Sequence, residues 1–155
     1  MWQRLQTIFL AIVVITMVAS LFFPLWKYVD GDGIQYDLYP LHYSITNGEQ
    51  KTTAYFPYCV TAILMVASAT VAAVAIRRFD NRKVQMSLVA LNTFFLLGVM
   101  GCVYYFSRKL TADFQHVGLS RFALWTIFAA VAFNWLAMRF IRRDEKIVRD
   151  SERLR

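Results

Sequence analysis

The sequence from Tyr55 to Phe106 reads YFPYCVTAILMVASATVAAVAI (Tyr55–Ile76), RRFDNRK (Arg77–Lys83) and VQMSLVALNTFFLLGVMGCVYYF (Val84–Phe106). Each apolar segment supplies the roughly 20 residues that a helix needs to cross the hydrocarbon core of a bilayer. The basic segment between them is typical of a cytoplasmic turn, because lysine and arginine are enriched in cytoplasmic loops. We therefore predict an antiparallel pair of transmembrane helices over residues 55–76 and 84–106.

One further apolar segment lies on each side of this pair. Leu5–Leu25 precedes it and Leu119–Ile141 follows it. We interpret the first segment as a retained helix and not as a cleaved signal peptide, because its basic start is minimal and no clean small-x-small cleavage site follows it. The sequence therefore predicts an all-α membrane protein, an antiparallel bundle of four transmembrane helices in one domain, over residues 5–25, 55–76, 84–106 and 119–141.

The composition favours a membrane protein over one that binds nucleic acid. Hydrophobic residues make up 58% of the 155 residues, whereas soluble domains average roughly 45–50% even with glycine included. The net charge is +7, but the basic residues cluster at the ends of apolar segments instead of covering one face. A chain of this length forms a single domain. We expect the lipid bilayer as its surroundings and no nucleic acid among its partners.

The segment 27–54 is the longest polar connection between predicted helices, and it is weakly acidic. Asp30–Gly33 reads DGDG and predicts a turn. Asn47-Gly48 lies between Tyr43–Thr46 and Glu49–Thr53, which is the pattern of a hairpin with a tight primed turn. We predict a short extracytoplasmic loop that contains one hairpin and caps the outer end of the helices.

The basic residues also predict the orientation of the chain. Twelve of the 17 lie in segments that we place inside, so both termini are expected in the cytoplasm. The charged tail, residues 142–155, is predicted to continue the last helix as a cytoplasmic stalk. Glu145–Arg149 is an (i, i+4) pair, and three residues lie at helical spacing: Ile147, Ser151 and Leu154. Six basic side chains near the inner surface are expected to attract anionic lipid head groups, by about 1 kcal/mol each: Arg77, Arg78, Arg82, Lys83, Arg142 and Arg143.

Polar residues inside the predicted spans include Ser68, Thr70, Asn92 and Asn134. A polar group in hydrocarbon needs a partner, so we interpret these residues as intramembrane hydrogen-bonding contacts between helices. The alternative is that Asn92 and Asn134 line the cavity of a small-molecule transporter or a lipid-binding protein. No acidic residue lies in any predicted span, which argues against proton- or cation-coupled transport.

The two cysteines, Cys59 and Cys102, lie on neighbouring antiparallel helices at similar predicted depth. If they face each other, a disulfide or a thiol-redox pair is sterically possible. The alternative is a pair of buried free thiols that act as small apolar groups. A Cys-x-x-Cys motif, which thiol oxidoreductases use, does not occur in the sequence.

The sequence contains no recognisable catalytic motif, such as a Walker loop, a nucleophile elbow or a metalloprotease motif. Asp30-x-Asp32-Gly33 matches part of a calcium loop without its other ligands, and His42 and His116 lack a cysteine or a paired motif nearby. We predict no catalytic residue, no metal and no cofactor. The leading interpretation is a non-enzymatic structural or accessory protein that binds other membrane proteins or itself; the alternatives are the thiol-redox protein and the transporter or lipid-binding protein.

The two ends of the chain carry a resemblance. Met1–Ile8 (MWQRLQTI) and Arg143–Arg155 (RDEKIVRDSERLR) resemble the ends of an uncharacterised family of four-helix inner-membrane proteins of Bacteroidota, a domain of unknown function. The resemblance covers the whole chain. It implies a multi-pass protein of the bacterial cytoplasmic membrane and brings no catalytic residue with it. It directs attention to the two cytoplasmic ends, where the charged tail is either a recognition surface or a solvated helix face.

Overall fold

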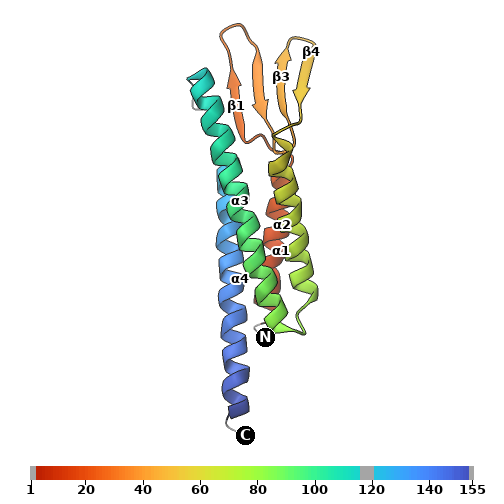
Figure 1. The fold of residues 1–155 in the computed structure, drawn as a ribbon, viewed down its shortest axis with the longest axis vertical. Coiled ribbons are helices and arrows are strands. Elements are labelled where there is room, and N and C mark those ends of the chain that lie inside the picture. Colours follow the sequence, from red (N-terminus) through yellow and green to blue (C-terminus); the bar gives the residue numbers. More distant parts are fainter. Residues whose placement is uncertain (1–2, 116–120, 154–155) are drawn as a thin grey trace.

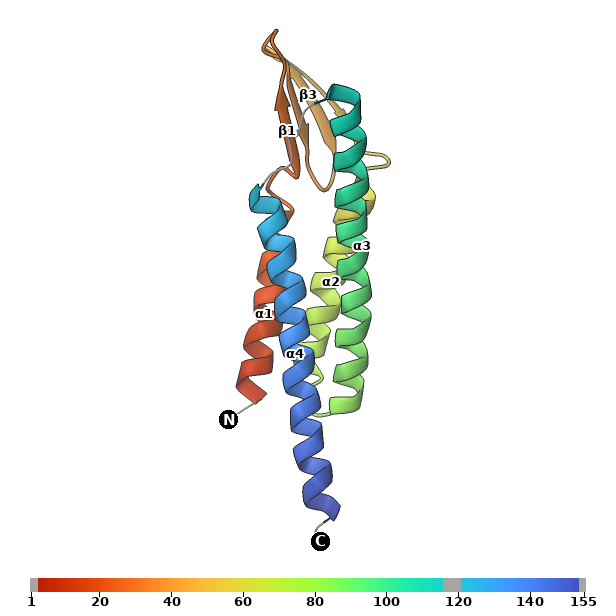
Figure 2. The same ribbon diagram turned by 90° about the vertical axis from the view of Figure 1, so that its left-hand side faces the viewer.

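The computed structural model describes residues 3–115 and 121–153. In these residues it contains four helices, α1 (Gln3–Ser20), α2 (Cys59–Arg77), α3 (Arg82–Phe114) and α4 (Arg121–Arg153). They run alternately up and down, and a sheet stands at one end of them (Figure 1). Helices α1 and α3 each contact both α2 and α4, so the four helices pack in a ring, which we call the bundle. Both ends of the chain lie at the bundle end opposite the sheet (Figure 2).

The turn between α2 and α3 lies within the basic segment Arg77–Lys83, as the sequence predicts. Helix α2 continues through Arg77, and α3 begins at Arg82 after an N-cap at Asn81. The Asn81 side chain accepts a hydrogen bond from the backbone N–H of Val84 at 3.2 Å. Such a cap satisfies one of the amide donors that a helix start leaves without a partner.

Helix α3 is longer than the sequence predicts. It runs to Phe114 instead of ending at Phe106. Its 33 residues span about 50 Å at 1.5 Å per residue, well beyond the roughly 30 Å core of a bilayer. The extra turns therefore carry α3 past the other helices to lie beside the sheet (Figure 2).

Small residues of α2 face the interior of the bundle. Four alanines are buried there: Ala62, Ala69, Ala72 and Ala75. Large side chains from the other helices, including Leu10, Met17 and Leu96, fill the remaining space. Gly98 of α3 lets α2 approach closely, because an added Cβ would lie 3.3 Å from a methyl group of Leu64.

The polar connection after α1 forms an antiparallel sheet in the order β1-β2-β3-β4. Its strands are β1 (Trp26–Val29), β2 (Gln35–Leu38), β3 (Tyr43–Asn47) and β4 (Gln50–Ala54). The pairing opposes Trp26 to Leu38 and Leu38 to Tyr43. Because alternate residues of a strand share one face, this register places six apolar or aromatic side chains on the same face: Trp26, Tyr28, Tyr36, Leu38, Tyr43 and Ile45.

Both glycine turns of the sheet lie close to their predicted positions. Gly33 has a φ of 77° in the predicted turn between β1 and β2. In the predicted hairpin of β3 and β4, Asn47 pairs with Gln50, so the central residues are Gly48 and Glu49 instead of Asn47 and Gly48. Gly48 has a φ of 57°, and a glycine with positive φ at the first central position is the pattern of a type II′ turn.

The predicted all-α bundle of four transmembrane helices is wrong in two respects. First, segment 27–54 is a four-stranded sheet and not a short loop with one hairpin, because residues on each side of the Asp30–Gly33 turn also alternate and pair. Second, two helices of the described residues, α2 and α3, are long and apolar enough to cross a membrane. The apolar part of α1, Leu5–Ser20, is shorter, because the chain leaves the helix ahead of Pro24.

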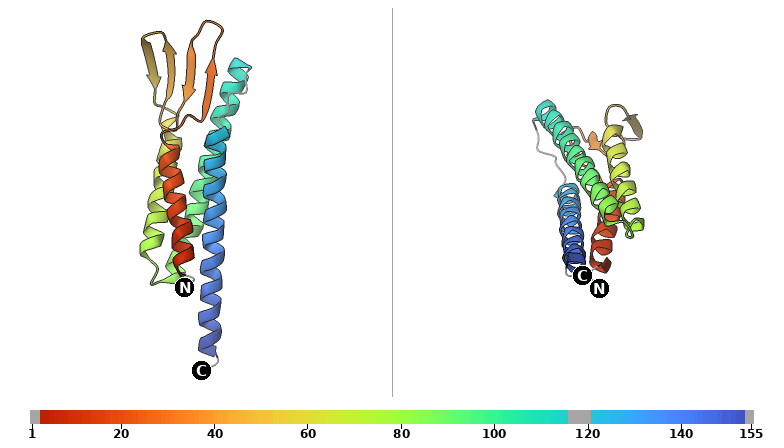
Figure 3. Two further views of the ribbon diagram at one scale, coloured as in Figure 1. Left: turned by 180° about the vertical axis from the view of Figure 1, so that it is seen from behind. Right: turned by 60° about the horizontal axis from the view of Figure 1, so that its bottom comes forward.

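The charged tail continues α4 as a helix to Arg153, as the sequence predicts. The last part of α4, residues 146–153, projects beyond the ends of the other helices (Figures 1 and 3); we call it the stalk. The predicted start of the last helix at residue 119 and the end of the tail at residues 154–155 lie outside the described residues.

Candidate functional site

A hydrogen-bonded polar cluster joins α3 and α4 inside the bundle. The side-chain amide of Asn92 donates to the side-chain oxygen of Asn134 at 2.8 Å. Asn134 in turn donates to the hydroxyl of Thr93 at 2.9 Å and to the carbonyl oxygen of Val89 at 3.3 Å. Both asparagines are buried. The side-chain oxygen of Asn92 has no hydrogen-bond partner in the described part of the chain, so the cluster keeps one unused acceptor.

The other two predicted polar contacts do not join this cluster. Ser68 is fully buried, and its hydroxyl has no hydrogen-bond partner among the described residues. Thr70 is exposed and donates to the carbonyl oxygen of Val66 one turn earlier in its own helix. Asn92 and Asn134 are therefore the two members of the predicted set that the structure brings together.

A groove of about 520 Å³ lies beside this polar cluster, between α3 and α4. Ala90 and Thr93 line it from α3, and α4 contributes Val131, Trp135, Arg139 and Arg142. The guanidinium carbon of Arg139 lies 5.6 Å from the ring centroid of Trp135, within the range of a cation–π contact. The groove thus combines apolar side chains with two arginines, and sequence reasoning had assigned Arg142 to the surface without placing it in a groove.

A second groove, of about 350 Å³, lies between α1 and α2. Its lining is apolar except for the hydroxyl of Thr70, and it includes Val18, Met65 and Ala73. It contains none of the basic side chains that distinguish the α3–α4 groove.

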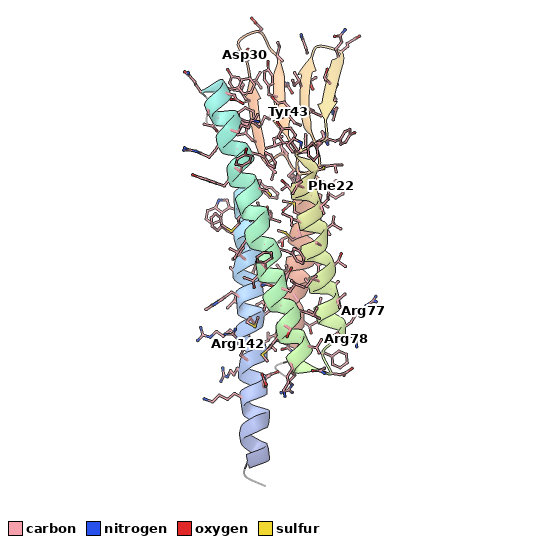
Figure 4. The ribbon with its side chains drawn as sticks, in the orientation of Figure 1. Phe22, Asp30, Tyr43, Arg77, Arg78 and Arg142 are labelled. Carbon is pink, nitrogen blue, oxygen red and sulfur yellow. The ribbon has the colours of Figure 1, made fainter. Side chains whose placement is uncertain are left out.

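The basic residues of the predicted inner surface gather at the bundle end opposite the sheet. Figure 4 places Arg77, Arg78 and Arg142 at this end, at a similar height along the bundle. Arg77 and Arg78 are exposed, as are Lys83, Arg142 and Arg143. Arg82 differs, because its guanidinium donates to the backbone carbonyl of Asp144 at 2.8 Å and so ties the start of α3 to α4.

The two cysteines are free thiols on different helices. Cys59 is the first residue of α2, and Cys102 lies in the half of α3 that is nearer the sheet. Both are partly buried. The proposed disulfide or redox pair stays a prediction. Among the described residues, no group of three or more histidine, cysteine or acidic side chains could hold a metal ion. His116 lies outside the described residues.

An aromatic cluster, which sequence reasoning did not predict, joins the sheet to the end of α3. The ring of Phe114 lies 4.5 Å from Tyr36, 5.5 Å from Tyr28 and 5.7 Å from Trp26, measured between centroids. Tyr43 packs against Tyr58 at 5.4 Å. The helical spacing of Phe106, Leu110 and Phe114 is the signal that could have revealed this contact, because these residues lie on one face of α3.

Tyr43 makes this cluster sensitive to alkaline pH. Burial, and to a smaller extent the nearby Tyr58, Tyr36 and Asp113, raises the pKa of the Tyr43 hydroxyl from 10.0 to about 12. An unfolded chain therefore loses this proton first as the pH rises, and the free energy of unfolding is expected to fall between pH 10 and pH 12. Tyr43→Phe should make this decrease shallower in denaturant titrations across that range. Equal slopes for the two proteins would contradict the prediction.

Comparison with models of protein families assigns most of the chain to a family. No curated protein matches the chain. Residues 2–154 match the family described as Domain of unknown function (DUF4293), so the match includes the bundle, the sheet and the stalk. Because it covers nearly the whole chain, the protein belongs to this uncharacterised family.

Proposed function

We propose that the protein is a non-enzymatic accessory subunit of the bacterial cytoplasmic membrane, held in the bilayer by α2 and α3. The large exposed apolar surface of α2 and α3 supports the membrane location. Only 39% of the most apolar part of α2 and 28% of that of α3 is buried, whereas the core helix of a soluble protein is mostly buried. Large apolar side chains such as Ile63, Phe94 and Leu97 point outward. Lipid would remove from water an apolar surface that soluble proteins rarely expose.

The charge distribution supports one orientation in that membrane. The α2–α3 turn, the basic residues around it and both chain ends lie at the same end of the bundle (Figures 1 and 4). Lysine and arginine are enriched on the cytoplasmic side of membrane proteins. We therefore place this end and the stalk in the cytoplasm and the sheet on the outer side.

The stalk is the observation that carries the accessory role. It continues α4 as a helix beyond every other helix of the described chain (Figure 1). Its sequence contains both acidic and basic residues, and Ile147 is 55% exposed. Most of the stability of a helix in a protein comes from packing an apolar face. A helical segment from a partner protein, with complementary charges around an apolar position for Ile147, would supply this packing.

Removing residues 146–155 is expected to release the partner and leave the bundle intact. This cut keeps Asp144, so the hydrogen bond from Arg82 survives. The measurement is purification from gently solubilised membranes through an N-terminal tag, with crosslinking and quantitative mass spectrometry. We expect near-stoichiometric recovery of one membrane protein with the full-length chain and at least about tenfold less with the truncated one, which corresponds to about 1.4 kcal/mol.

The matched control is the double variant Arg77→Gln, Arg78→Gln, which removes two charges from the same end of the bundle but leaves the stalk unchanged. It should keep the partner. Equal recovery with and without the stalk, or recovery of this chain alone, would overturn the proposed role.

A further inference from the structure

The α3–α4 groove has two chemically different ends. Helix α4 descends toward the basic end of the bundle, so Val131 and Trp135 come before Arg139 and Arg142 along the groove. Val131 and Arg142 are 11 positions apart, which corresponds to roughly 16 Å along the helix. Figure 4 places Arg142 at the height of Arg77 and Arg78, where the basic surface of the bundle lies. The groove therefore has an apolar part inside the bundle region and a cationic part at its basic end.

The cationic part has the chemistry of a phosphate site. None of the described residues that line the groove is acidic. Arginine presents a planar set of donors that binds phosphate oxygens in pairs. The Trp135 ring lies against Arg139, and tryptophan is enriched at the level of lipid head groups, where its ring meets acyl chains and its N–H meets water.

The apolar part fits an acyl chain better than a polar metabolite. Ala90 and Val131 contribute only hydrocarbon, and the Thr93 hydroxyl is already used as the acceptor of the Asn134 amide. A free anion would leave this part of the groove empty. A phospholipid fills both parts at once, with its phosphate at the arginines and one chain along the apolar side chains.

We propose that the α3–α4 groove binds one anionic phospholipid, with its phosphate on Arg139 and Arg142 and an acyl chain between Ala90 and Trp135. This inference rests on the proposed membrane location but not on the partner protein. The site is specific in position, unlike the diffuse attraction of anionic lipid to the whole basic surface.

The test is native mass spectrometry of the delipidated full-length protein in detergent, titrated with phosphatidylglycerol or with phosphatidylcholine of the same acyl chains. We expect one phosphatidylglycerol to bind more tightly than any phosphatidylcholine. A basic residue near an anionic head group contributes about fivefold in affinity. The double variant Arg139→Gln, Arg142→Gln should therefore weaken the tight site by about thirtyfold. Arg77→Gln, Arg78→Gln removes the same charge outside the groove and should leave the site unchanged.

A pair of uncharged variants tests the acyl chain separately. Ala90→Phe fills the α3–α4 groove and should abolish the tight site, whereas Ala73→Phe fills the α1–α2 groove and should not. Circular dichroism of each variant shows whether the helices are intact.

Four outcomes would overturn the lipid site. In the first, the Arg77/Arg78 and Arg139/Arg142 double variants weaken phosphatidylglycerol binding equally, and in the second, Ala90→Phe binds the lipid as tightly as the wild type. In the third, millimolar inorganic phosphate alone displaces the lipid. In the fourth, Ala90→Phe abolishes a dimer of the protein and leaves lipid binding unchanged. If the chain stays in water without detergent, the membrane location itself fails. Stalk-dependent recovery of a partner without a tight lipid would overturn only this inference.

Discussion

Trp26→Ala is expected to destabilise the protein by about 3–5 kcal/mol, the usual cost of truncating a fully buried tryptophan. The Trp26 side chain is 0% exposed, and its ring packs against both Tyr28 of the sheet and Phe114 of α3. Its loss would leave a cavity where the sheet meets the end of α3. Trp26 belongs to the same buried apolar cluster as bundle residues such as Met17 and Met65, so we expect the sheet and the adjoining end of the bundle to loosen together.

Two measurements check the Trp26 prediction. Thermal unfolding in detergent micelles should show the loss of stability, and limited proteolysis should cut the Asp30–Gly33 turn faster than in the wild type. Trp26→Phe is the control. It keeps an aromatic ring and removes an indole N–H that has no hydrogen-bond partner among the described residues, so its cost should stay below about 1.5 kcal/mol. A small effect of Trp26→Ala would mean that the sheet is held elsewhere.

Asn134→Leu is expected to cost about 2–3 kcal/mol. It removes three hydrogen bonds, and it leaves the amide of Asn92 buried without a partner. An unsatisfied buried polar group costs about 1–3 kcal/mol, whereas a single hydrogen bond between membrane helices averages about 0.6 kcal/mol. Most of the loss of stability should therefore come from the buried Asn92 amide that is left without a partner, and not from the lost hydrogen bonds themselves.

A double-mutant cycle separates these two contributions. The double variant Asn92→Leu, Asn134→Leu contains no buried amide that lacks a hydrogen-bond partner at these positions. We therefore expect it to be more stable than Asn134→Leu alone, with a coupling energy of about 1 kcal/mol or more between the two substitutions. Unfolding in a series of detergent mixtures gives the four stabilities. Additive effects would show that the two amides do not stabilise each other. Loss of partner recovery or lipid binding in a stable double variant would instead favour the alternative that the asparagines line a functional cavity.

The sequence predicted the helices better than the connection between the first two. The hairpin of β3 and β4 was predictable, because Asn47-Gly48 is a strong local turn signal. Strands β1 and β2 were missed because each is four residues long, and because Trp26 directly follows the apolar segment 5–25, which was predicted to be a helix. The extension of α3 was missed because the predicted helix ended with the apolar segment at Phe106, although Leu110 and Phe114 continue the apolar face of the helix.

The candidate site was predictable only as a set of separate residues. Periodicity places Asn92 and Asn134 in two helices, but their contact depends on how α3 and α4 are rotated about their axes. The same rotation places Arg139 and Arg142 at the end of the α3–α4 groove. An exposed helical residue and one in a groove have the same local sequence pattern.

The sequence alone therefore determined the apolar helical segments, the glycine turns and the concentration of basic residues at one end. Each of these follows from the local chemistry of neighbouring residues. The tertiary structure decided the order and register of the four strands, the aromatic contact between the sheet and α3, and the polar cluster and groove between α3 and α4. These features join residues that are far apart in the chain, so their free energy depends on which faces meet and not on local propensity.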